Sequence, residues 1–134
     1  MPITIAATAS EANSYGNPFV GPAEHRDVVK VDISDLGSNE VDADGYIKPG
    51  LPLAKDGNMV TAGVPVYGSV MEATKIATGN TDTILDATTD CFVAVCTHGV
   101  QNRDITEDNL GRALNADEIA GFDLAPCTIK LTRT

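Results

Sequence analysis

Turn signals crowd the middle of this chain and limit it to short strands. Three turn-forming dipeptides fall within 14 residues: Asp44-Gly45, Pro49-Gly50 and Asp56-Gly57. They leave room only for strand fragments such as Tyr46-Ile47 and Leu51-Pro52-Leu53. Because Pro52 has no backbone N–H to donate to a neighbouring strand, its fragment is expected at the edge of a sheet.

Apolar segments on either side of this region predict the main strands. Residues 28–33 are β-branched and partly alternating, and residues 127–132 alternate cleanly, so each predicts a strand. Residues 91–96 are apolar on both faces and predict the central buried strand. Residues 64–76 suggest one long bent strand with Gly68 as a bulge or kink.

Two short helices are expected near the C-terminal end. Thr106 is suited to cap a helix that runs to about residue 114, with acidic residues in its first turn. Asn115 and Glu118 have the spacing of an N-cap and its N3 acid, and Gly121 is a plausible stop. The expected fold class is therefore mainly β (α+β), with one or two short helices.

Residues 1–26 lack the periodicity of a helix or strand that could bury one face. Such a segment does not recover its ordering entropy alone, at roughly 1–2 kcal/mol per residue. We therefore expect an extended N-terminal arm over residues 1–26, ordered by another protein, and a β-rich domain over residues 27–134. Strand-compatible and apolar residues predict the contacts of the arm: Ile3, Ile5, Tyr15, Pro18, Phe19 and Val20.

Composition narrows the function classes. The formal charge is −10, from 19 acidic and 9 basic residues, and such a field repels the phosphates of nucleic acids. No apolar run approaches the length of a transmembrane helix, and no signal peptide is recognised. Trp is absent, so an aliphatic core is expected. Cys91, Cys96 and Cys127 are an odd number at non-metal spacing, which favours free thiols in a reducing compartment.

No motif for catalysis or cofactor binding stands out. Neither a dinucleotide-binding nor a P-loop glycine pattern occurs. Residues 40–47 resemble the start of an EF-hand calcium loop, but Leu51 stands where the bidentate Glu belongs, so a solvated turn is the favoured interpretation. His25 has no partner at metal-binding spacing. We therefore expect no catalytic residue, no metal, no cofactor and no enzymatic activity.

One alternative from another class remains open. Cys96 and His98 lie two residues apart in a predicted strand and would share a face. A Cys–His nucleophile also needs an orienting group and an oxyanion donor, for which the sequence has no recognisable pattern. The alternative is a small β-barrel enzyme or a ligand-binding module that uses the Cys96/His98 region, and a calcium module on residues 40–47 is a third interpretation.

The order of these features resembles the head-decoration proteins of tailed bacteriophages, the lambda decoration-protein-like family. The resemblance lies in the arm, the segment DGYIKPGLPLAKDG, the strand and loop CFVAVCTHGVQNRD, a short helix and the final strand LAPCTIKL. It implies a small β-tulip or barrel-like fold without catalytic residues. It also implies a homotrimer on the outer capsid surface of the virion, at three-fold positions, whose arms pair with the major capsid protein.

The broken strands themselves also suggest an oligomer. Short strands with few aromatic residues leave apolar edges that a second subunit could cover. The residues expected at this subunit interface are Leu51, Leu53, Val64 and Val66.

Overall fold

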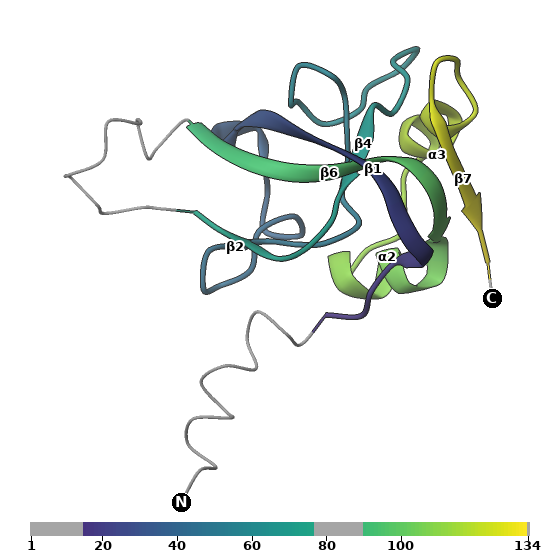
Figure 1. Ribbon diagram of the computed structural model, residues 1–134. Helices are drawn as coiled ribbons and strands as arrows, with labels where there is room; N and C mark the ends of the chain where they lie inside the picture. The colour runs from purple at the N-terminus through teal and green to yellow at the C-terminus, as the bar shows by residue number, and fades with distance from the viewer. Residues whose placement is uncertain (1–14, 77–89, 134) are drawn as a thin grey trace, which may run out of the picture.

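The computed structural model describes residues 15–76 and 90–133 (Figure 1). Ile3, Ile5 and the turn predicted at residues 79–82 lie outside the described residues. The described chain is mainly β with two short α-helices, as the sequence predicted, and it also has one short 3-10 helix. Its elements are β1 (Phe19–Asp32), η1 (Ile33–Asp35), β2 (Tyr46–Ile47), β3 (Pro52–Leu53), β4 (Gly68–Val70), β5 (Thr74–Lys75), β6 (Asp90–Asn102), α2 (Arg103–Leu110), α3 (Ala116–Phe122) and β7 (Thr128–Thr132).

The two longest strands, β1 and β6, form the centre of the sheet. They run antiparallel from the pair Asp32 and Asp90 to the pair Phe19 and Gln101. One face of the two strands is buried in the core and carries Val29, Val31, Val93 and Val95. The prediction of a central strand at residues 91–96 is confirmed, but Phe92 points away from the core and is 49% exposed.

β1 begins earlier than the sequence predicted. It starts at Phe19, so the expected arm boundary after residue 26 is wrong, and residues 19–26 belong to the sheet. Between the pairs Val20–Val100 and His25–His98, the four residues 21–24 oppose Gly99 alone. This bulge interrupts the alternation of side chains, which is why the sequence pattern did not reveal the strand.

β6 joins three other strands into one sheet. The order along the sheet is β1-β6-β4-β3, and β7 pairs with the last part of β6 in parallel, from His98–Thr128 to Asn102–Thr132. β3 lies at an edge, as Pro52 predicted, and β7 confirms the predicted terminal strand. β2 and β5 form a separate pair. Figure 1 shows β6 curving from the β1 pairing toward β7.

Residues 64–76 do not form one bent strand. They hold β4 and β5, with an irregular segment between them. A Cβ on Gly68 would stand 2.8 Å from Val95 Cγ2 and 2.9 Å from the Cys96 carbonyl oxygen. Gly68 is therefore required by the close approach of β4 to β6, and not by a bulge.

The helices begin and end at different residues from those expected. Asn102 caps α2 by accepting a hydrogen bond from the N–H of Ile105, and Gly111 ends it in the left-handed region at φ 71°. The predicted cap, Thr106, is buried inside α2. The capping box of Asn115 and Glu118 is confirmed at α3.

Gly121 lies within α3 rather than ending it. The absence of a side chain at Gly121 matters, because a Cβ there would approach Val60 Cγ1 and the Val64 carbonyl oxygen to 2.9 Å. None of the described helices is long and apolar enough to cross a membrane.

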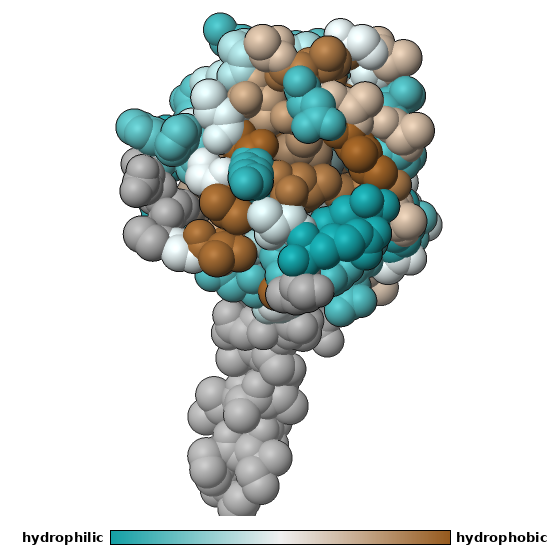
Figure 2. Space-filling model, turned by 90° about the vertical axis from the view of Figure 1, so that its right-hand side faces the viewer, coloured by the Kyte–Doolittle hydropathy of each residue, from teal (hydrophilic) through white to brown (hydrophobic). Residues whose placement is uncertain are grey.

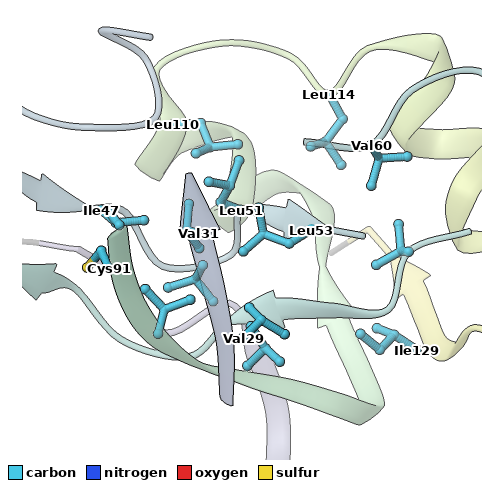
Figure 3. Close-up of a cluster of buried hydrophobic side chains, with 14 of the residues drawn as sticks. Val29, Val31, Ile47, Leu51, Leu53, Val60, Cys91, Leu110, Leu114 and Ile129 are labelled. Atoms are coloured by element: carbon cyan, nitrogen blue, oxygen red, sulfur yellow. The ribbon is translucent and has the colours of Figure 1, made fainter. Parts of the chain in front are cut away.

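The core is mainly aliphatic, as the absence of Trp suggested, and Phe122 is its one aromatic member among the described residues. Figure 3 shows side chains from β1, from the loops before β4 and from β7 gathered in it. Leu51 and Leu53 are fully buried there, and Val66 is 1% exposed. The prediction that these three residues form an exposed subunit edge is therefore wrong. Val64 is half-buried and packs against the same core. Burial of each such side chain contributes roughly 1.5–3 kcal/mol, which explains why the turns fold them inward.

Candidate functional site

The N-terminal segment is fastened to the domain at Tyr15, Gly16 and Pro18. The Tyr15 hydroxyl donates a short hydrogen bond to the Asp42 carboxylate. Gly16 donates its N–H to Asn109 Oδ1 at 3.0 Å and accepts from Asn109 Nδ2 at 2.8 Å. The N–H of Asn102 donates to the Pro18 carbonyl at 2.6 Å. These contacts hold residues 15–18 against the domain beside α2, and we call residues 15–18 the arm root.

The predicted arm contacts therefore divide into two groups. Pro18 is buried, and Tyr15 and Phe19 are half-buried, so these side chains pack largely against their own domain. Val20 is 55% exposed and remains available to another protein. Sequence reasoning missed Asn109, whose position inside a short helix carried no signal of its contact with Gly16.

The loop at residues 40–47 is an acidic turn held by its own backbone. Asp42 Oδ1 accepts hydrogen bonds from the N–H groups of Asp44 and Tyr46, both at 2.9 Å. Burial tends to raise the pKa of Asp42, but the hydrogen bonds from Tyr15, Tyr46 and Asp44 outweigh burial and lower it. The geometry is that of an Asx turn, in agreement with the turn interpretation of this segment.

Glu40 turns inward to a buried ion cluster instead of toward the acidic turn. Its carboxylate accepts from the Gly37 N–H at 2.7 Å and from Arg112 Nε at 2.9 Å. Arg112 also makes a bidentate contact with Glu118, at 2.8 and 3.0 Å. The hydrogen bonds to Glu118 are the main cause of a raised pKa for Arg112. The cluster joins the loop of Glu40 to α3. Because both carboxylates are buried, its role is to hold the fold together.

A cavity of about 760 Å³ opens beside the bulge of β1 and β6. It is lined by residues 25–27, 54–56, 64–67 and 97–98, together with Pro126 and Thr128. We call it the histidine pocket, because both histidines of the chain line it. The His25 and His98 rings meet edge to face, with their centroids 5.3 Å apart. Among the described residues, no group of three or more metal-ligating side chains converges here or elsewhere.

The pairing of Cys96 with His98, on which the alternative interpretation rests, does not form. Cys96 is buried, and its thiol donates to the backbone carbonyl of His98 at 3.2 Å, whereas the His98 side chain is exposed. His98 faces His25 across the strands. The sequence could not reveal this partner, because the bulge at residues 21–24 sets the register that brings the two histidines together.

A tyrosine–carboxylate pair lies in the same pocket. The Tyr67 hydroxyl donates a short hydrogen bond to Asp27, whose carboxylate also accepts from the Val28 N–H at 2.7 Å. The bond from Tyr67, followed by that from Val28, lowers the pKa of Asp27, and the same bond raises the pKa of Tyr67. Lys55 Nζ lies 5.9 Å from the centroid of the Tyr67 ring.

No protein-family model, curated protein or solved structure matches this chain.

Proposed function

We propose that this chain is a noncatalytic capsid decoration protein. It acts as a homotrimer that binds the outer surface of a major capsid protein shell at three-fold positions and stabilises the viral head against the pressure of packaged DNA. In this proposal the domain is of the β-tulip or barrel-like type. Gly57, in the turn after β3, closely approaches the backbone of Lys30 in β1. This approach supports a sheet that curls toward a closed barrel.

The observation that carries the proposal is the arm root. Two hydrogen bonds between the Gly16 backbone and the Asn109 side chain, the backbone hydrogen bond from Asn102 to Pro18 and the Tyr15–Asp42 contact hold residues 15–18 against the domain, so the preceding segment starts from a fixed point. Fourteen residues span at most about 50 Å when fully extended, which is enough to reach well onto a neighbouring protein. Ile3 and Ile5 fall on one face of an added strand, as pairing with an exposed sheet edge requires.

The surface charge agrees with a protein that works at high local density. A formal charge of −10 on 134 residues disfavours nonspecific self-association and contact with packaged nucleic acid. Neither property requires a catalytic site. The buried ion cluster around Arg112 serves to hold the fold together.

Exposed apolar side chains indicate which surface the subunits of the proposed trimer would use to contact each other. Val28 and Phe92 are 59% and 49% exposed and lie on adjacent strands, since Val28 pairs with Ala94 and Lys30 pairs with Phe92. The two side chains are thus diagonal neighbours on the outer face of the sheet. They replace Leu51, Leu53 and Val66, which are in the core, as the proposed centre of the trimer contact.

Apolar side chains also gather on the face that carries β7 and α3. Figure 2 shows these apolar residues with polar residues scattered among them. Leu124, which follows α3, is 36% exposed, and Ile119 and Leu131 on these elements are half-buried. This face offers a second surface for the capsid or for a neighbouring subunit.

The proposal is tested by co-sedimentation of the purified chain with undecorated heads. These heads are assembled from the major capsid protein of the same virus. Ile3→Asp and Thr4→Asp add the same charge to the same segment, but only the first replaces a side chain on the apolar face. Ile3→Asp is expected to weaken binding roughly tenfold or more, as loss of one buried aliphatic side chain predicts, and Thr4→Asp much less. Absence of binding by the unaltered chain, or equal effects of both variants, would contradict the proposal.

A further inference from the structure

We propose that the histidine pocket binds a small amphipathic carboxylate, with its carbon chain or ring against the apolar lining residues and its carboxylate facing Arg26 and the two histidines. This inference is independent of capsid decoration, because the pocket shares no residue with the arm root. It is supported by the size of the cavity, by the apolar residues in its lining and by the lining side chains that have hydrogen-bond donors without a partner in the described chain.

The cavity has the dimensions of a small-molecule site. Its volume of about 760 Å³ lies within the 300–1,000 Å³ that is typical for such sites. Five of the lining residues are apolar: Ala54, Val64, Pro65, Val66 and Pro126. Val66 also packs into the core, so this part of the lining is held by the fold and does not need a ligand to form.

The acceptors in the pocket are already occupied. The Asp27 carboxylate accepts from Tyr67 and from the N–H of Val28. The Asp56 carboxylate accepts from the backbone N–H and the side-chain amide of Asn58, at 3.0 and 3.3 Å. Both acids therefore have partners within the chain, and a ligand gains little by offering them further donors.

The donors are not matched in the same way. Within the part of the chain that the structure describes, Arg26 makes no ion pair, and the exposed imidazoles of His25 and His98 meet each other edge to face without a hydrogen bond to another group. Lys55 adds a further cation to the lining. A guanidinium presents only donors, and each imidazole has at least one. A ligand that satisfies these groups must bring acceptors, and a carboxylate supplies several.

The position of these groups within an acidic molecule sharpens the inference. Two of the nine basic residues and both histidines line one cavity in a chain of charge −10. The overall field repels anions, so only an anion that combines local donors with burial of apolar surface gains from this pocket. This combination favours an aliphatic or aromatic acid over a free inorganic anion.

The experiment uses the fluorescent probe 1-anilinonaphthalene-8-sulfonate, an aromatic anion, with the full-length protein. We expect saturable binding of one probe per chain, which octanoate displaces at least tenfold more effectively than octan-1-ol, a ligand with the same chain and no charge. No saturable probe binding, or equal displacement by the acid and the alcohol, would overturn the proposal.

Two variants place the site. Arg26→Gln is expected to weaken octanoate binding at least fivefold and to leave octan-1-ol binding within twofold, and His98→Gln gives a second, independent measure of the contribution of the donor groups. Arg133→Gln is the matched control, because it removes the same charge from an exposed residue outside the pocket. Thermal unfolding checks that each variant is folded. Equal losses in Arg26→Gln and Arg133→Gln would indicate an effect of net charge only and would overturn the assignment of the pocket.

Discussion

At the scale of single residues, the contacts with the largest consequences are charged groups held inside the domain. Arg112 stands between Glu40 and Glu118, whose side chains are 7% and 0% exposed. Two buried carboxylates share one guanidinium, so neither retains a compensating charge if the arginine is lost.

Replacing Arg112 with Met is therefore expected to destabilise the domain by about 3–5 kcal/mol, because it leaves two buried carboxylates unpaired. Urea unfolding measures the change. The control is Arg133→Gln, which breaks an exposed pair with Asp104 and is expected to cost less than about 1 kcal/mol. Equal small losses in the two variants would show that the Arg112 cluster contributes no more than a surface pair.

The arm root has a pH dependence with a definite sign. Hydrogen bonds lower the pKa of Asp42 in the folded chain, despite the opposing effect of burial. Its stabilisation is present above the unfolded pKa of about 3.9 and is lost as the pH falls through the lower folded value. The Tm of the unaltered chain should exceed that of Asp42→Asn at pH 6, and the difference should vanish at about pH 2. Asp108→Asn, an exposed carboxylate on α2, serves as control; a difference for Asp42→Asn that does not change with pH would contradict this account.

At the scale of elements, local patterns predicted the elements whose signals are local. The alternation of residues 127–132 gave β7, and Asn115 with Glu118 gave the cap of α3, because each pattern depends on neighbours in the chain. The start of β1 depends on its pairing with β6, and the division of residues 64–76 depends on the pairing of β4 with β6 and of β5 with β2. A single sequence does not display these pairings. The bulge opposite Gly99 and the contact between His25 and His98 likewise depend on the pairing of distant strands, so the sequence did not predict them.

Gly68 tests whether packing decides the geometry of β4. Gly68→Ala is expected to destabilise the domain by roughly 1–3 kcal/mol, because the new methyl group would overlap Val95 and the backbone of Cys96. The comparison is Gly63→Ala, where nothing lies within 4 Å of the added Cβ and only the positive φ of 79° opposes the change. Chemical denaturation measures both. If Gly68→Ala is neutral or stabilising, β6 and β4 are not in fixed close contact.

At the scale of the whole molecule, the sequence led to the right class of fold but to the wrong surface. An aliphatic β domain with two short helices followed from composition and turn signals. The expected subunit edge failed because Leu51 and Leu53 lie between turns, and turns fold such residues inward as readily as outward. Phe92 was assigned to the core from its apolar neighbours, since a strand with two apolar faces does not reveal which face meets solvent.

The last prediction separates the subunit contact from the core. If the chain forms a trimer through the outer face of β1 and β6, Phe92→Glu should shift it toward the monomer in light scattering, because a charge in an apolar contact loses its hydration. The fold should survive, since Phe92 is already 49% exposed. Val20→Glu is the matched control on β1, as exposed and apolar as Phe92 but at the other end of the strand pair. Leu53→Ala, in contrast, should lower the free energy of unfolding by about 2–5 kcal/mol through the cavity it leaves. A protein that is monomeric before any substitution, or a trimer that Phe92→Glu leaves intact, would rule out this face as the contact.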